Sequence, residues 1–459
     1  MPFELMLEDD SVLHVSECLR VLPGRRIVAR AQWRDAGTVL AKIYIGRQWR
    51  RDADREHAGL RAMRKAGVRT PSIITRANLR GGGQVLLLGF LDGATTLLDV
   101  LSPLSIHLPV EAHRLARLDE AFSLVGTLHC GGLVHHDLHL GNFLAHDSGL
   151  YLVDGDAVRE FEQPDPARDC LENLALLIAQ FPLSWEDAIE PLLATYHSTS
   201  KHAIESRVHD LKMAIERVRT QRTEKYLKKI GRDSSAFIVT HETTRFTVTS
   251  RRHSAALAQF LSTPDAAVSK GCLLKDGRTC TVVRTKATND SHIVIKRYNI
   301  KDLGHAVSRA WRPSRAWHSW REAHRLRMLG IPTPEPLAVI ESRIGPIRHR
   351  AWLVTEYCPG LSLATLLRAE SPPPDEVAHS LCLLFKTLNR ARVTHGDLKS
   401  SNLLWWKGEI VLIDLDAMVH HRSDLSHRAA WARDRIRFLR NWPAGCPLHA
   451  WLDAHLPPV

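Results

Sequence analysis

The chain has 459 residues, of which 44% are hydrophobic and 24% charged, and its formal net charge is +12 at pH 7. This length suits two domains better than one, and the balance of apolar and charged residues indicates a globular rather than a disordered chain. The most apolar stretch, Val85–Leu101, contains two aspartates and is shorter than the ~20 residues that cross a bilayer, so no transmembrane helix is expected.

The opening segment and the cysteines predict a cytoplasmic protein. Residues Met1–Asp10 are acidic and lack the basic start and apolar run of a secretory signal. The eight cysteines include no pair at the spacing of a zinc or redox motif, which is typical of a reducing compartment. The positive charge suits a nucleotide, a phosphorylated glycan or an anionic membrane face, and charge alone does not distinguish these from nucleic acid.

The first strong pattern is a buried strand that carries a lysine. The run Val39–Tyr44 is apolar except for Lys42 and reads as a strand. A helix-periodic stretch follows in Arg55–Met63, with Glu56 as its acid, and it ends at the turn Ala66–Pro71, where Gly and Pro stop a helix.

Further along lies a loop with several polar side chains. The segment Leu133–Leu144 contains Asp137 and Asn142, which are five positions apart (137 to 142). The segment Leu150–Asp156 contains Asp154, twelve positions after the asparagine (142 to 154). Apolar runs on both sides of these residues predict short strands that hold the polar groups in fixed places.

The same strand and helix recur in the second half of the chain. The run Ile293–Tyr298 contains Lys296 and again reads as a buried strand. The helix-periodic stretch Arg321–Met328 contains Glu322 and stops at the turn Leu329–Pro334.

The polar loop recurs as well. The segment Val393–Leu404 contains Asp397 and Asn402, and Ile410–Asp416 contains Asp414, with spacings of five (397 to 402) and twelve (402 to 414). The loops are offset by 260 positions (397 minus 137). Chance agreement of both spacings is improbable, so the pattern indicates an internal duplication.

The duplication predicts two α+β domains with a boundary near residues 245–255, where strands resume after a helical stretch from 164 to about 243. Each domain is expected to have a small β-rich N-lobe and a mainly helical C-lobe. The expected ranges are 1–245 for the first domain, with lobes of about 1–90 and 91–245, and 246–459 for the second, with lobes of about 246–357 and 358–459.

These residues resemble the protein-kinase-like superfamily, whose catalytic loop reads His-x-Asp-x-x-x-x-Asn and whose strand lysine pairs with a helix glutamate. The resemblance implies two tandem kinase-like domains that use ATP and Mg²⁺. Proton acceptance from the substrate hydroxyl would fall to Asp137 and Asp397. Mg²⁺ would be held by Asn142, Asp154, Asn402 and Asp414. Nucleotide phosphates would be held by Lys42 and Lys296, paired with Glu56 and Glu322, while His135 and His395 would brace the loops. The alternative, surface carboxylates in hairpins, is disfavoured because five positions recur together.

The sequence departs from protein kinases in ways that disfavour a protein substrate. Neither half has the Gly-rich loop or an Ala-Pro-Glu motif, and 45 residues (459 minus 414) follow Asp414, too few for a protein-kinase activation segment and full helical lobe. The expected phosphate covers are plain hairpins at Val21–Arg25 and Leu274–Arg278.

The second half also resembles the lipopolysaccharide kinase family of Gram-negative bacteria, through Lys296–Asn299, Arg312–Trp317 and Gly330–Pro334. The first half resembles that family more loosely. The resemblance implies phosphate transfer from ATP to an inner-core sugar, heptose or Kdo, at the cytoplasmic face of the inner membrane. The lipopolysaccharide core glycolipid would be the acceptor, with peripheral membrane association and no nucleic-acid partner. The alternatives are a protein Ser/Thr kinase, a small-molecule kinase, or one non-catalytic half.

Three further features of the sequence bear on the expected function. The Arg- and Trp-rich segment 305–330 suits a phosphorylated glycolipid or membrane surface, and equally an amphipathic helix with Trp in the core. Asp156 and Asp416 suit a second ion, although a capping role is preferred and both are left out of the expected site. The first half is expected to be the degenerate copy, because Leu88–Phe90 stands where the second half has Thr355–Tyr357.

Overall fold

The computed structural model describes residues 2–102, 104–105, 107, 111–162, 165–202, 204, 207–299, 313–344 and 347–458. Its contacts divide the chain into a first unit (1–104, 109–181 and 186–219) and a second unit (105–108, 182–185 and 220–459). The division falls within α6 (Val208–Leu227), whereas the sequence predicts a boundary near residues 245–255. Strand β12 (Phe237–Glu242) already belongs to the sheet of the second unit.

The first unit contains an antiparallel sheet in the order β1-β2-β3-β4-β6-β5, followed by helices. The strands are β1 (Phe3–Met6), β2 (Val12–Leu22), β3 (Arg26–Gln32), β4 (Thr38–Tyr44), β5 (Ile73–Asn78), β6 (Gln84–Gly89), β7 (Thr95–Thr96), β8 (Leu133–His135), β9 (Phe143–His146), β10 (Gly149–Leu152) and β11 (Val158–Glu160). The helices are α1 (Trp49–Lys65), α2 (Leu97–Leu101), α3 (Ala112–Cys130), α4 (Pro166–Ile178) and α5 (Ile189–Thr199), with the 3-10 turns η1 (Arg34–Ala36), η2 (Leu140–Asn142) and η3 (Gly155–Ala157). The 3-10 turn η4 (Leu183–Ala188) has residues in both units.

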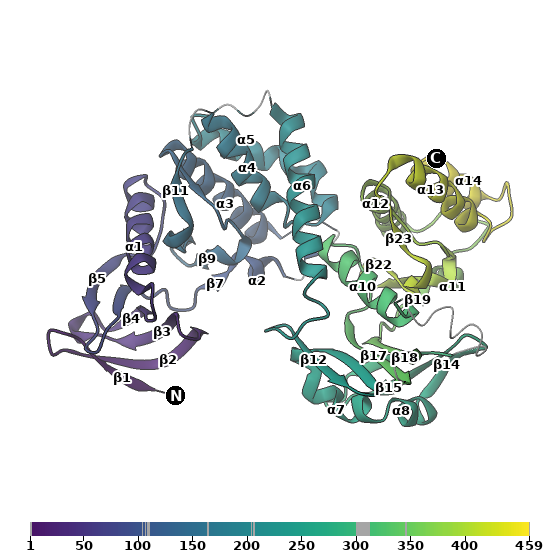
Figure 1. Cartoon of the computed structure of the whole chain (residues 1–459). Coiled ribbons are helices and arrows are strands. Elements are labelled where there is room, and N and C mark those ends of the chain that lie inside the picture. Colours follow the sequence, from purple (N-terminus) through teal and green to yellow (C-terminus); the bar gives the residue numbers. More distant parts are fainter. Residues whose placement is uncertain are drawn as a thin grey trace. The chain divides into compact units, whose positions relative to one another are not determined.

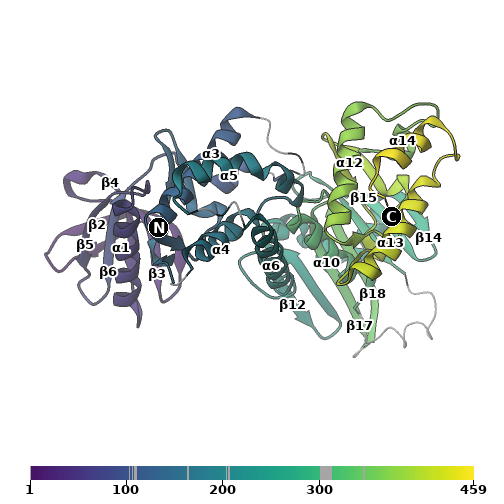
Figure 2. The same cartoon turned by 90° about the horizontal axis from the view of Figure 1, so that it is seen from above.

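Side chains of β4 alternate between the apolar core of the first sheet and the opposite face, which carries Lys42. Ala41 and Ile43 lie in an apolar cluster formed by the strands, because successive side chains of a strand point to opposite faces. Lys42 and Tyr44 therefore lie on the other face, where α1 runs beside the sheet (Figures 1 and 2). The strand expected at Val39–Tyr44 and the helix expected at Arg55–Met63 are both present, and both are longer than the sequence pattern indicates.

The second unit has the sheet order β12-β13-β17-β18-β16-β15-β14. Its strands are β12 (Phe237–Glu242), β13 (Arg245–Ser250), β14 (Cys272–Gly277), β15 (Cys280–Lys286), β16 (His292–Tyr298), β17 (Pro336–Ile344), β18 (Ile347–Glu356), β19 (Leu361–Ser362), β20 (Val393–Thr394), β21 (Leu403–Trp406), β22 (Glu409–Leu412) and β23 (Val419–His420). Its helices are α7 (Ser254–Ser262), α8 (Pro264–Lys270), α10 (Arg315–Met328), α11 (Leu363–Leu366), α12 (Asp375–Arg390), α13 (Asp424–Leu439) and α14 (Pro447–His455), with the 3-10 turns η6 (Arg251–His253), η7 (Ser400–Asn402) and η8 (Leu415–Ala417).

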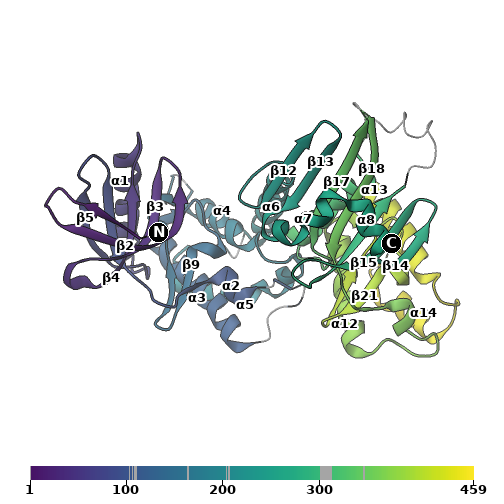
Figure 3. The same cartoon turned by 90° about the horizontal axis from the view of Figure 1, so that it is seen from below.

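Both faces of the second sheet are covered. Apolar residues of α7 and α8 pack on one face around Ile293 and Ile295, and Figure 3 shows these helices beside the strands. On the other face Trp320 of α10 is fully buried against Phe237, with Trp317 packed beside the same cluster. The described tryptophans of the Arg- and Trp-rich segment thus serve the core, while residues 305–312 lie outside the described part.

Smaller sheets repeat in the two units. The order β10-β9-β7 and the pair β11-β8 in the first unit match the order β22-β21-β19 and the pair β23-β20 in the second. A separate core of α12, α13 and α14 supports these strands in the second unit. The fold is therefore mixed α/β. Among the described residues, no helix combines the length and apolarity that crossing a membrane requires.

Candidate active site

The two lysines occupy the same place in their sheets. Lys42 of β4 lies opposite Val28 of β3, and Lys296 of β16 lies opposite Val282 of β15. On the other side each lysine faces a leucine, Leu86 in β6 or Leu353 in β18. The registers of the two sheets thus agree residue by residue around the lysine.

The polar loops are also built alike. Asn142 Nδ2 donates a hydrogen bond to the carbonyl of Asp137 over 2.9 Å, and Asn402 Nδ2 donates to the carbonyl of Asp397 over the same distance. Because each amide nitrogen is engaged, the amide oxygen is the atom that can bind a metal. The spacing of five residues in the sequence is thus the spacing that closes this loop.

Each loop is braced by the preceding histidine, as the sequence suggested. His135 Nε2 lies 3.1 Å from the carbonyl oxygen of Val153, and His395 Nε2 lies 2.9 Å from that of Ile413. Burial lowers the pKa of His135, so this imidazole is neutral and its Nε2–H donates to the carbonyl. The histidines therefore join the two halves of each loop.

Asp154 and Asp414 share an unusual backbone conformation. Their φ angles are 72° and 63°, in the left-handed region that non-glycine residues rarely adopt. In both units the aspartate directly precedes a 3-10 turn, η3 or η8. Such strain is concentrated at functional sites, and here it turns the carboxylate toward the strand lysine.

In the first unit the expected lysine–glutamate pair is present. Lys42 Nζ lies 2.5 Å from Glu56 Oε1, and the glutamate is fully buried. The backbone N–H groups of Gly155 and Asp156 also donate to the Glu56 carboxylate, each over 3.2 Å. Glu56 therefore ties α1 to both the strand lysine and the loop after Asp154.

Close contact between two glycines makes this arrangement possible. A Cβ atom placed on Gly59 of α1 would collide with the backbone carbonyl of Gly155. A Cβ atom on Gly155 would in turn lie 2.6 Å from the backbone nitrogen of Leu60. The helix and the loop can touch only because both positions lack a side chain.

Replacing Gly59 with alanine is expected to destabilise the first unit by roughly 1–3 kcal/mol, because the added methyl group meets rigid backbone. This sign is opposite to the gain of about 1 kcal/mol that Gly→Ala gives in an ordinary helix interior. Thermal unfolding of the full chain measures the effect. The matched control is R61A on the exposed side of the same helix, with an expected change within ~0.5 kcal/mol. An unchanged or raised midpoint for G59A would contradict the close packing.

The corresponding pair expected in the second unit does not form. Lys296 Nζ instead lies 2.5 Å from Asp414 Oδ1 and 2.9 Å from Asp416 Oδ2. Glu322 is buried and pairs with Arg325 of its own helix over 3.0 Å. Among the described residues, no ion pair links Glu322 with Lys296.

The physical reason lies at the two glycine positions. Glu322 corresponds to Glu56 at an offset of 266 (322 minus 56), so Arg325 corresponds to Gly59 (325 minus 59). At the loop offset of 260, Leu415 corresponds to Gly155 (415 minus 155). Two side chains thus occupy the place where helix and loop touch in the first unit, and Arg325 offers Glu322 a closer partner.

Asp416, which the sequence interpretation left out, is the centre of the second site. Its carboxylate accepts hydrogen bonds from Tyr298 and Ser319 over 2.7 Å each, and from Arg315 over 2.6 Å. Burial opposes ionisation of Asp416, but Lys296 and the hydrogen bonds from Tyr298 and Ser319 outweigh it and lower the pKa of this carboxyl. Burial likewise opposes charge on Lys296, yet the two aspartates raise the pKa of its ammonium group. The pair is therefore ionised at neutral pH.

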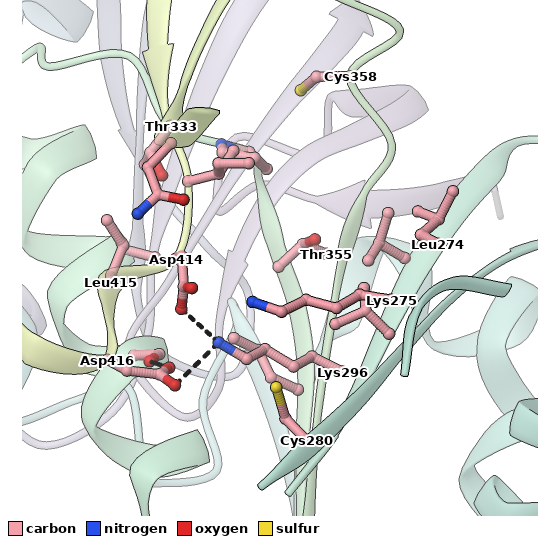
Figure 4. Close-up of a pocket in the computed structure, with 18 of the residues that line it drawn as sticks. Leu274, Lys275, Cys280, Lys296, Thr333, Thr355, Cys358, Asp414, Leu415 and Asp416 are labelled. Carbon is pink, nitrogen blue, oxygen red and sulfur yellow. Dashed lines mark hydrogen bonds and ion pairs between the residues drawn. The ribbon is translucent and has the colours of Figure 1, made fainter. Parts of the chain in front are cut away.

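Lys296, Tyr298, Ser319, Asp414 and Asp416 line a cavity of about 400 Å³ in the second unit. Lys275 of β14 and Lys296 of β16 extend toward Asp414 (Figure 4). Leu274 and Lys275 come from the hairpin that the sequence suggested as a phosphate cover. Apolar side chains and the segment after β18 complete the lining, with Val282, Val294, Leu353, Thr355, Glu356, Tyr357, Leu404 and Ile413 among them. A slot with apolar walls and cations at one end suits a base joined to phosphates.

Cations surround Asp397 at the second loop. Lys399 Nζ lies 2.9 Å from its carboxylate and Arg437 Nη1 lies 3.4 Å away, while 34% of the aspartate side chain is exposed. The equivalent Asp137 is 69% exposed and lies 3.7 Å from His139 Nε2. The two candidate proton acceptors therefore differ in surrounding charge.

The second unit offers a suitable pair of Mg²⁺ ligands. Asn402 and Asp414 both line the cavity and supply the oxygen donors that Mg²⁺ prefers, with room for water and phosphate to complete the coordination. Within the described part of the chain, no group of three or more His, Cys, Asp or Glu residues is placed to hold a metal ion by itself. A metal at this site would thus depend on a bound nucleotide for further ligands.

Residues 268–437 match the sequence model of the lipopolysaccharide kinase (Kdo/WaaP) family, a range that includes every cavity residue named above. The RIO-type serine/threonine-protein kinase Rio1 of Haloferax volcanii is 25% identical over 177 residues, covering 32% of this chain and 55% of the relative. The chain thus spans about half the length of the curated relative it matches. The family match and this relative support an ATP-dependent kinase.

Two solved structures are similar in part. The structure of WaaP in complex with acyl carrier protein aligns with a TM-score of 0.34 and 20% identity, over 46% of this chain and 88% of that chain. The CAK complex of Chaetomium thermophilum bound to ATP-gamma-S aligns with a TM-score of 0.27 and 17% identity, over 33% of this chain and 49% of that chain.

Proposed function

We propose that the chain is an ATP-dependent phosphotransferase of two kinase-like units, and that the second unit phosphorylates a sugar hydroxyl of the lipopolysaccharide inner core, on heptose or Kdo. One observation supports this most strongly: Lys296, Asn402 and Asp414 meet at one cavity of about 400 Å³, within the segment that matches the lipopolysaccharide kinase family. Transfer of a phosphoryl group needs such positioned cations and metal ligands more than it needs covalent chemistry.

The residues of the second unit would have different roles in phosphoryl transfer. Lys296 and Lys275 would bind the phosphates, and Asp416 would hold the Lys296 ammonium group in place. Asn402 and Asp414 would hold Mg²⁺, which when bound neutralises charge on the phosphates. Asp397 would orient the acceptor hydroxyl and take its proton as the oxygen attacks.

The surroundings of Asp397 favour a small anionic acceptor. Lys399 and Arg437 place two cations beside the carboxylate, which suits a sugar that carries its own carboxylate or phosphate. Only eight positions separate Asp416 from Asp424, where α13 begins (424 minus 416). This leaves little chain between the loop and the helix on which a peptide substrate could lie. The acceptor would be presented at the inner face of the inner membrane, where the protein would associate peripherally.

A phosphate-transfer assay tests the proposal. The full chain is incubated with Mg²⁺ and [γ-³²P]ATP, and separately with inner-core glycolipid ending in Kdo, inner-core glycolipid ending in heptose, casein, or an aminoglycoside. We expect label on one of the glycolipids. The core oligosaccharide of a strain without this protein should lack the corresponding phosphate group. Absence of label from every acceptor would contradict the kinase assignment.

A protein acceptor is the second candidate, and the similarity to a RIO-type serine/threonine-protein kinase favours it. Label on casein with none on either glycolipid would replace the sugar proposal by this one. Label on the aminoglycoside alone would indicate a small-molecule kinase.

A further inference from the structure

Sheet register identifies one position where the two units differ in charge. Opposite Tyr44 of β4 stands Arg26 of β3, and opposite the equivalent Tyr298 of β16 stands Cys280 of β15. Cys280 lines the cavity of the second unit beside Lys296 (Figure 4). The first unit therefore has an arginine where the second has a small neutral side chain.

The arginine lies within the predicted metal site. Arg26 Nη1 lies 3.9 Å from Asp154 Oδ1 and 3.8 Å from Glu56 Oε2, and only 14% of its side chain is exposed. Lys42 Nζ also lies 3.9 Å from Asp154 Oδ1. Two fixed cations thus share the carboxylate expected to hold Mg²⁺.

This charge arrangement does not fit a divalent metal. A guanidinium group keeps its charge at any physiological pH, so Mg²⁺ at Asp154 would face two like charges within a few ångströms. The next carboxylate offers no replacement, since Asp156 pairs with Arg55 over 2.8 Å. In the second unit the metal-site carboxylate Asp414 forms an ion pair with Lys296, while Lys275 lines the cavity without an ion pair to Asp414 among the described residues, and Cys280 adds no charge.

The same cations suit phosphate oxygens. Arg20 stands at the register position of the cavity residue Lys275, because Arg20 lies opposite Val28 and Lys275 lies opposite Val282. The base end of the site is also similar in the two units. The guanidinium of Arg30 lies 4.9 Å from the ring centre of Phe90, as that of Arg284 lies 5.2 Å from the ring centre of Tyr357.

We propose that the first unit binds a nucleoside triphosphate without a divalent metal, and that Arg26 together with Lys42 supplies the positive charge. The inference rests on the proposed function in so far as it treats the repeated site as a nucleotide site. It adds that the first unit is a binding unit rather than a second centre of transfer, because Glu56, Asp154 and Asp156 are already paired with the chain's own cations.

The experiment uses the full chain with K296A, which blocks the second site, and ATP as the probe in isothermal titration calorimetry. We expect one ATP per chain in EDTA, with a Kd within about threefold of the value in Mg²⁺. Adding R26Q should weaken binding in EDTA at least ~10-fold, by loss of a charge-assisted contact. Adding R26C instead, which copies the second unit, should weaken ATP binding in EDTA as R26Q does. With R26C, ATP should bind when Mg²⁺ is present. Thermal unfolding shows that each variant is folded, and R26C replaces R26Q if the latter is not.

No binding by K296A in EDTA, or binding that R26Q leaves unchanged, would overturn the inference. Failure of the proposed function is seen separately in the phosphate-transfer assay with wild-type chain. Metal-free binding without transfer would remove the proposed function and keep the inference. Transfer without metal-free binding would do the reverse.

Discussion

Replacement of Asp397 by asparagine is expected to lower kcat for phosphate transfer by ~10³-fold or more, with a much smaller change in KM for ATP. Asn keeps the size and one acceptor oxygen of the side chain but cannot take the proton of the attacking hydroxyl. Because Asp397 lies outside the cavity lining that would hold the nucleotide, ATP binding should be retained. Single-turnover transfer from [γ-³²P]ATP measures the chemical step directly.

Two controls make this result specific. D375N changes an exposed acid of the second unit at the start of α12, and it should leave kcat within about twofold. D137N makes the same change at the equivalent position of the first unit, and it should also leave kcat within about twofold because that unit is proposed to bind without transferring. A large loss with D137N, together with none for D397N, would move transfer to the first unit.

The second large effect is expected at Asp416. D416N should lower kcat/KM for ATP by roughly 10²-fold, whereas E322Q should lower it less than about threefold. Asp416 holds the Lys296 ammonium group over 2.9 Å and also accepts from Tyr298 and Arg315. Its loss leaves the Lys296 ammonium group, whose side chain is only 13% exposed, with one fewer counter-charge. Glu322 has its own partner in Arg325 and does not touch the lysine.

A merely structural role for Asp416 would give a different pattern. D416E keeps the charge and should recover a large part of kcat/KM for ATP, while unfolding midpoints show whether D416N is folded. Loss of stability without a change in KM for ATP would contradict a role in positioning Lys296. A larger loss of kcat/KM for ATP in E322Q than in D416N would support the pairing of Lys296 with Glu322 that the sequence predicts.

Much of the site could be predicted from spacing within single segments. The loop residues follow one another at fixed intervals, and the Asn142 and Asn402 hydrogen bonds to the preceding aspartate carbonyls explain why five residues are needed. The strand lysines were found because a charged residue interrupts an apolar run. Features of this kind can be predicted from the sequence because the residues of a single segment determine them.

The partner of Lys296 could not be predicted in this way. Whether a glutamate or an aspartate reaches it depends on how closely α10 approaches the loop after Asp414, and Arg325 and Leu415 determine that distance from two separate segments. Alignment of the two halves could have predicted the change of partner, because it places Arg325 opposite Gly59 and Leu415 opposite Gly155. Arg26 was missed for a related reason, since only the sheet register places it beside Asp154.

The division between the two units could not be predicted from local patterns either. A continuous helix, α6, runs through the division at residues 219 and 220, and no Pro- or Gly-rich linker marks it. The strand β12 has a polar and exposed end, so its pairing with β13 is specified by the partner strand rather than by its own apolar content.

The most direct test of the account is the anomalous diffraction of Mn²⁺ in crystals of the full chain grown with Mn²⁺ and a non-hydrolysable ATP analogue. One manganese peak should lie between Asn402, Asp414 and the phosphates, with Lys296 on the same phosphates, and none should lie at Asn142 and Asp154. A peak at the first site, or a nucleotide in the second unit with its phosphates away from Lys296 and Asp414, would contradict it.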